Sequence, residues 1–240
     1  MTKQELDILL THLTIAHRMR EDLMKPRVAL GNQIGRLIKN AKNRGETITK
    51  GDFAIDIREN SKREKEYTKT MIALVKQLPI HDWWCSFKGL DSLGLAAIVA
   101  ETGDLSDYSN PAKVWRRMGL DVWEGEANKN RFAGVNTGYS KRRRMVAFRT
   151  ANPIIQHRTV PYREVYDQRK TIEIERDLVG YNKGYVEKHK VFLLKHYTTS
   201  KAKILAGRLP QCIINLRAHR YMTKRLLRDL WVEWQRVMGE

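Results

Sequence analysis

Apolar residues recur at helical spacing in the N-terminal third of the 240-residue chain. Leucines, isoleucines and alanines follow one another three or four positions apart over residues 6–16 and again over 30–41. A third run covers residues 67–78 and ends at Pro79. Because a helix has about 3.6 residues per turn, each run places its apolar side chains on one face. The pattern therefore predicts two long amphipathic helices joined by a polar turn at 40–50, either as a helical hairpin or as a dimerising coiled coil.

The rest of the chain is also predicted to be helical, with more interruptions. Gly89 and Gly94 bracket a short hairpin, which an apolar helix follows, and Pro111 suits the first turn of the next helix. Leucines and tryptophans at helical spacing form an apolar stripe near the C-terminus. These patterns predict a mostly α protein with three parts: a helical hairpin or coiled coil at 1–80, a helix-hairpin-helix domain at 81–150, and a basic helical region at 151–240 that packs on it.

Basic residues strongly outnumber acidic ones. The chain has 45 lysines and arginines against 27 aspartates and glutamates, which gives a formal net charge of +18. The excess is concentrated, because residues 82–126 carry four basic and eight acidic side chains whereas residues 127–150 carry seven basic and none acidic. A compact chain with this charge repels itself, and a polyanionic partner relieves that repulsion. The composition therefore indicates binding to DNA, to structured RNA or to both.

Several other classes of protein do not fit the sequence. The longest uninterrupted apolar stretch is residues 95–100, whereas a membrane-spanning helix needs about 20 apolar residues. The N-terminus lacks the basic segment and apolar run of a secretory signal, and two cysteines, Cys85 and Cys212, give no disulfide framework. No cysteines and histidines are spaced as the tight pairs of a structural zinc site. We expect a cytoplasmic protein with no membrane partner, no metal and no cofactor.

Two segments contain candidate contacts to phosphate. In residues 88–94, glycines allow backbone N–H groups to approach a phosphate, and the N-terminus of the following helix adds its dipole. In residues 141–144, four consecutive cations begin a predicted basic helix, and guanidinium groups offer paired donors to phosphate oxygens. The alternatives are a plain turn between core helices and a solvated basic helix face. The candidate nucleic-acid-binding residues are Lys88, Gly89, Gly94, Lys129, Arg131, Lys141, Arg142, Arg143, Arg144 and Arg149.

Several short motifs follow one another along residues 88–149. After the glycine hairpin and its apolar helix come Glu101-Thr102-Gly103-Asp104, then Tyr108-Ser109-Asn110-Pro111 and then Met118-Gly119-Leu120. A basic helix follows, from Ser140-Lys141-Arg142 through Ala147-Phe148-Arg149. In this order and spacing, residues 87–149 resemble the C-terminal transposase domain of the insertion-sequence 110 family, the bridge-RNA-guided recombinases.

The resemblance implies a role in DNA transposition or recombination. Family members carry an RNase-H-like domain with acidic metal ligands, then a coiled coil, ahead of the transposase domain. Residues 1–80 are similar to that coiled coil, and the RNase-H-like domain has no counterpart here. The family's catalytic serine lies in a loop after the Gly-Leu step, whereas residues 121–129 contain no serine. The catalytic role is therefore not carried over, the catalytic residues stay unknown, and Ser140, the nearest serine, is the one candidate nucleophile.

Three functions fit these observations. The first is a nucleic-acid-binding protein that resembles the C-terminal part of a transposase and is not catalytic alone. The second is an active recombinase component whose RNase-H-like domain is supplied by a separate chain. The third is a non-catalytic structural or protein-interaction module. We expect the first, as a homodimer formed through residues 1–80 that binds DNA, structured RNA or both. The resemblance implies a bacterial, archaeal or phage-encoded protein associated with the nucleoid.

Overall fold

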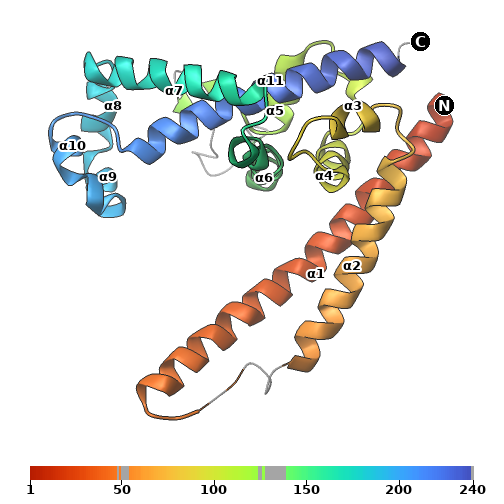
Figure 1. Ribbon diagram of the computed structural model, residues 1–240, viewed down its shortest axis with the longest axis horizontal. Coiled ribbons are helices and arrows are strands. Elements are labelled where there is room, and N and C mark those ends of the chain that lie inside the picture. Colours follow the sequence, from red (N-terminus) through yellow and green to blue (C-terminus); the bar gives the residue numbers. More distant parts are fainter. Residues whose placement is uncertain (48, 50–53, 124–125, 128–138, 239–240) are drawn as a thin grey trace. The chain divides into compact units, whose positions relative to one another are not determined.

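The chain is mostly α-helical (Figure 1) in the part that the computed structural model describes, residues 1–47, 49, 54–123, 126–127 and 139–238. The predicted mostly α class is therefore confirmed. Two strands of two residues each, β1 (Val122–Trp123) and β2 (Glu126–Ala127), pair antiparallel. The elements gather into two compact units, each described by itself below, and the three parts expected from the sequence stay a prediction.

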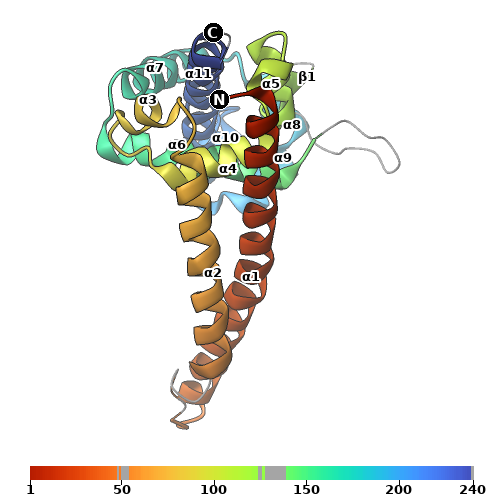
Figure 2. The ribbon, with the colours of Figure 1, turned by 90° about the vertical axis from the view of Figure 1, so that its right-hand side faces the viewer.

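The first unit, here called the α1–α2 unit, comprises Met1–Asp82 and Asp91–Leu105. Its long helices α1 (Lys3–Asn43) and α2 (Ala54–Val75) lie side by side (Figure 2), and both pack against α4 (Ser92–Thr102). Most of the apolar face predicted for α1 is buried in this packing, at Leu6, Leu9, Leu10, Leu13, Ala16, Ile34 and Ala41. Leu37 of the second predicted run is 50% exposed. Burial of one apolar stripe is what stabilises a helix this long, because helix propensity alone contributes little.

Polar contacts also join the helices of the α1–α2 unit. Glu64 of α2 accepts hydrogen bonds from two α1 arginines, at 3.3 Å from Arg20 Nη2 and at 2.8 Å from Arg27 Nε. Where α1 meets α4, His17 Nε2 and Glu101 Oε1 lie 3.1 Å apart, and both side chains are buried. At the start of α1, the side chain of Thr2 caps the helix. These pairs fix the relative register of the helices in addition to the apolar contact.

The second unit, here called the C-terminal unit, comprises Trp83–Leu90 and Ser106–Glu240. The chain first enters this unit within α3 (His81–Cys85) and enters it again within the 3₁₀ turn η2 (Leu105–Asp107). No helix in the described part of the chain is long and apolar enough to cross a membrane. The remaining elements are α5 (Pro111–Arg117), α6 (Lys141–His157), α7 (Tyr162–Leu178), α8 (Lys183–Lys188), α9 (Lys190–His196), η3 (Thr198–Ser200), α10 (Lys201–Leu205) and α11 (Gln211–Met238).

Helix α11 is the centre of the C-terminal unit. It packs against α5, α6 and α7, and α7 runs along it (Figure 1). The apolar stripe predicted near the C-terminus is confirmed, because Leu226, Leu227, Leu230 and Trp234 are fully buried. The neighbouring Trp231 keeps a polar contact, since its Nε1 donates to the backbone oxygen of Tyr108 at 2.9 Å. One face of α11 therefore lies in the core. Side chains on its other face lie between α5, α7 and β1.

A buried carboxylate fixes the end of α7. Asp177 Oδ1 accepts from Asn182 Nδ2 at 3.1 Å and from the Leu209 N–H at 2.9 Å, and its Oδ2 accepts from Arg208 Nε at 3.3 Å. The short helices between α7 and α11 close around their own apolar core, formed by Val186, Leu193, Ile204, Leu209 and Ile214. The C-terminal half of α7 is thereby held in place against α11.

Candidate anion-binding pocket

The predicted basic helix exists and is α6. Ser140 is its N-cap, and the Ser140 hydroxyl accepts a hydrogen bond from the Arg143 N–H at 3.3 Å. The charged side chains lie at different depths: Lys141 and Arg149 are exposed, whereas Arg142 to Arg144 are half-buried. The structure therefore assigns Ser140 a capping role and leaves the phosphate contacts of the basic run as predictions.

Arg144 is engaged inside the C-terminal unit. Its Nε donates to the backbone oxygen of Gly119 at 2.6 Å, and its guanidinium carbon lies 4.4 Å from the centre of the Tyr139 ring. Burial lowers the pKa of Arg144, and the effects of Tyr139 and Asp121 oppose that shift. The guanidinium thus links the start of α6 to the end of α5, which the sequence did not indicate.

The glycine hairpin is explained by packing. Gly89 has φ +89°, and a Cβ there would lie 2.8 Å from His157 Cδ2 and 3.2 Å from the Pro153 oxygen, so glycine is required where this turn meets α6. Lys88 is exposed, and its backbone oxygen accepts a hydrogen bond from the Thr159 hydroxyl. The plain-turn alternative therefore accounts for Gly89 without a ligand.

The remaining candidate nucleic-acid-binding residues lie in other parts of the chain. Gly94 belongs to the α1–α2 unit, where it lies in the first turn of α4 and its N–H donates to the capping Asp91 carboxylate at 2.7 Å. Lys129 and Arg131 lie outside the described residues. The structure thus does not bring the predicted residues together as one described site, and their contacts with nucleic acid stay predictions.

Replacing Gly89 by alanine is expected to lower the free energy of unfolding by about 2 kcal/mol, from the left-handed conformation and the contact with α6 together. Gly180→Ala is the matched control, because Gly180 has φ +81° with open space around it, and about 1 kcal/mol is expected there. Urea unfolding of both variants measures the difference. Equal losses would show that the contact with His157 and Pro153 adds nothing.

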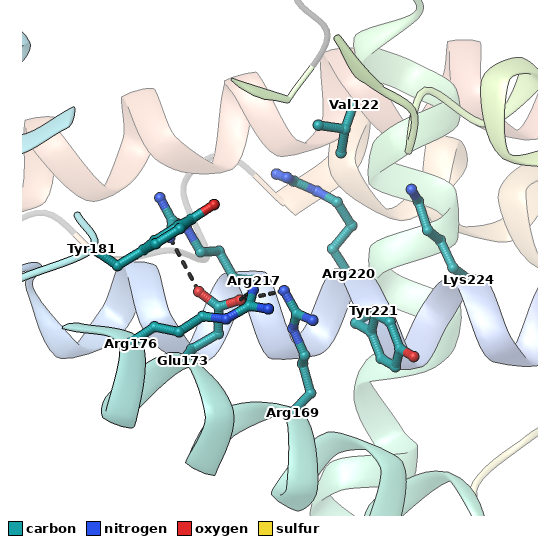
Figure 3. A pocket seen from close by; sticks show the side chains of 9 residues that line it. All are labelled: Val122, Arg169, Glu173, Arg176, Tyr181, Arg217, Arg220, Tyr221 and Lys224. Carbon is teal, nitrogen blue, oxygen red and sulfur yellow. Dashed lines mark hydrogen bonds and ion pairs between the residues drawn. The ribbon is translucent and has the colours of Figure 1, made fainter. Parts of the chain in front are cut away.

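A basic pocket lies between α7, α11 and β1, and none of its residues was singled out in the sequence (Figure 3). It has a volume of about 190 Å³, and five of its side chains are cationic while one is a carboxylate. We call it the α7–α11 pocket. Its lining consists of Val122, Arg169, Glu173, Arg176, Tyr181, Arg217, Arg220, Tyr221 and Lys224. The net charge of +4 makes the pocket a candidate site for an anion.

One buried carboxylate forms ion pairs with three of the five cations. Glu173 is 2% exposed and is paired with Arg169, with Arg217 Nη1 at 3.1 Å and with Arg176 Nη1 at 3.9 Å (Figure 3). Arg217 also donates to Asn182 Oδ1 at 2.7 Å. Glu173 therefore orients the guanidinium groups at the base of the pocket, and it neutralises one of their three charges.

Arg220 and Lys224 are the cations that Glu173 does not reach. Within the described chain, neither forms an ion pair with a carboxylate. Burial lowers the pKa of Arg220, and the charges of Arg144 and Arg217 lower it further. Burial likewise lowers the pKa of Lys224, with Arg220 adding to the shift and the charge of Asp121 opposing it. The Lys224 ammonium lies 5.1 Å from the centre of the Trp115 ring. Two desolvated cations beside other cations are a preorganised site for oxyanions.

The sequence does contain a signal for this pocket. Residues 217, 220, 221 and 224 follow the spacing of one helical face, and residues 169 and 176 lie two turns apart on α7. Among the described residues, no group of three or more histidine, cysteine, aspartate or glutamate side chains could hold a metal ion. No family model, curated protein or solved structure matches the chain.

Proposed function

We propose that the protein binds nucleic acid and that the α7–α11 pocket of its C-terminal unit holds a backbone phosphate. The observation that carries the proposal is the pair Arg220 and Lys224, which lie half-buried beside other cations. Within the described chain no ion pair with a carboxylate is formed by either, and of the two the charge of Asp121 acts on Lys224 alone. Such an arrangement is unfavourable unless an anion occupies the pocket. The net charge of +18 supports a polyanion over a small carboxylate as the source of that anion.

The chemistry of the pocket suits phosphate in particular. Guanidinium groups present paired N–H donors that match the oxygens of a phosphate, and four of the five cations are arginines. Three of them are already oriented by Glu173 or Asn182, so little side-chain entropy is lost when the anion binds. Phosphate contacts of this kind position a nucleic acid without reading its sequence.

The motif order of residues 87–149 supports the further proposal that the protein is derived from a transposase and is not catalytic alone. In that reading Ser140 is structural, because its hydroxyl caps α6. Homodimerisation through residues 1–80 is also proposed. It is supported by a second apolar stripe on α1, where Ile8, Ile15 and Met19 are about half exposed at spacings of seven and four residues. Binding of DNA, RNA or both takes place, on this proposal, in the cytoplasm.

The clearest test is the substitution Arg220→Met, which keeps the length of the side chain and removes its charge. We expect the affinity for duplex DNA or an RNA hairpin to fall about tenfold, and the slope of log K against log salt to decrease by about 0.9 in magnitude for DNA. The stability of the free protein should stay the same or rise, because repulsion by Arg144 and Arg217 is removed. Binding titrations over a salt series and urea unfolding measure the two effects.

Lys62→Met provides the matched control, because Lys62 is an exposed cation on α2 and its loss changes the net charge equally. If both variants lose the same affinity, the binding reflects overall charge alone. If Arg220→Met binds like the wild type while the wild type shows a steep salt dependence, the phosphate contacts lie elsewhere, and Lys141, Arg142, Arg143 and Arg149 become the next residues to replace.

A further inference from the structure

A second pocket adjoins the first and has a different character. It has a volume of about 430 Å³ and lies between α5, α7 and α11. Arg169, Tyr221 and Lys224 line both pockets, so the two are neighbours. Apolar or aromatic side chains form part of its wall, together with four cations: Trp115, Val165, Ile172 and Tyr221, and Arg169, Lys224, Arg225 and Arg228. The first pocket has five cations and a carboxylate. We call it the side pocket.

Two aromatic rings are held in the wall of the side pocket. The Trp115 ring is fixed because its Nε1 donates to the Lys224 backbone oxygen at 2.9 Å. The Tyr221 ring is 50% exposed, and the guanidinium of Arg169 lies 5.0 Å from its centre. Rings fixed in this way lose little side-chain freedom when a ligand binds beside them.

The polar groups at the rim complete the chemistry of a site for a planar polar ring. Gln168 is exposed and offers both a donor and an acceptor, while Arg228 adds a further exposed cation. The volume falls in the range of pockets that hold small organic ligands, about 300–1,000 Å³. Aromatic side chains beside cations are a usual environment of a bound nucleobase and its backbone.

We propose that the side pocket takes an unstacked nucleobase while the phosphate next to that base lies in the α7–α11 pocket. This inference rests on the proposed function and specifies its ligand as unpaired nucleotides. A duplex keeps its bases stacked inside the helix, where they cannot enter the pocket, whereas a single strand or a loop presents them. The protein should therefore bind single strands more tightly than duplexes with equal phosphate number.

The test compares three probes at one salt concentration: an oligothymidylate of about 15 nucleotides, a strand of equal length made of abasic nucleotides, and a duplex. The thymidylate and abasic strands carry the same phosphates. We expect the full-length wild-type protein to bind the thymidylate about tenfold more tightly than the abasic strand. Tyr221→Ala should abolish the preference for bases, so that the variant binds the thymidylate and the abasic strand with equal affinity.

Tyr221→Phe, which keeps the ring, should retain the preference for bases, and Phe192→Ala, which removes an exposed ring on α9, should change nothing. Photocrosslinking with a 4-thiothymidine strand adds a direct readout, with attachment expected at Trp115 or Tyr221. Equal affinity of the wild type for thymidylate and abasic strands overturns the base pocket and leaves phosphate binding intact. Absence of binding to all three probes overturns the proposed function together with this inference.

Discussion

Replacing Glu173 by glutamine is expected to lower the free energy of unfolding by about 3 kcal/mol at pH 7. The substitution keeps the shape of the side chain and removes the one negative charge that the α7–α11 pocket contains. Arg169 and Arg217 then remain desolvated in the absence of their carboxylate, because Glu173 is 2% exposed and they are about one quarter exposed. Removing one partner of a buried pair costs about 3–5 kcal/mol, and the partial exposure of the arginines favours the lower end.

The same variant should respond more strongly to anions than the wild type does. Its pocket carries five positive charges and no negative one, so tripolyphosphate or nucleic acid should stabilise it by a larger increment. Urea unfolding with and without tripolyphosphate measures both effects. Glu187→Gln is the matched control, because Glu187 is 71% exposed and its pair with Lys190, at 3.2 Å, is worth less than about 1 kcal/mol. Similar losses in the two variants would show that Glu173 does not hold the pocket together.

Local sequence patterns were sufficient to predict many of the helices. The buried faces of α1 and α11 follow helical periodicity, and periodicity depends only on the chain near each residue. Helix ends were also visible, since Gly103 ends α4 and Pro111 begins α5. The start of α6 follows Ser140, which caps it. These features share one cause, which is that they are determined within a few residues of chain.

The α7–α11 pocket could not be predicted in the same way, because it depends on the packing of two helices that are about 40 residues apart in the chain. On α7, Arg169, Glu173 and Arg176 alternate in sign, which is the usual pattern of a solvated helix face. The burial of Glu173 and the resulting orientation of its arginines appear only when α7 packs against α11. Arg144 is a further case, since its bond to the Gly119 oxygen joins segments that are separate in the sequence.

His219 is expected to make the C-terminal unit less stable in acid. Its imidazole is 5% exposed and stacks on the Phe148 ring, with 4.2 Å between ring centres. Thr223 Oγ1 lies 3.2 Å from His219 Nδ1 and donates to the His219 backbone oxygen, so Nδ1 carries the proton, and Nε2 is buried without a partner among the described residues. A second proton would therefore place a charge and an unsatisfied N–H in the core, and burial lowers the pKa of His219 to about 4.

The unfolded chain binds a proton at this histidine near pH 6.5, whereas the folded chain binds one only near pH 4, so acid favours the unfolded state. The contribution of His219 to stability is fully present above pH 6.5, decreases as the pH falls, and is lost below about pH 4. The shift corresponds to a loss of about 3 kcal/mol over this interval. Because carboxylates also titrate between pH 6.5 and pH 4, the measurement is a difference at each pH. It compares the free energies of unfolding in urea of the wild type and of His219→Gln. That difference in the free energy of unfolding should decrease by about 3 kcal/mol from pH 7 to pH 4. If the stabilities of the two proteins run parallel against pH, the folded protein protonates His219 as readily as the unfolded chain does.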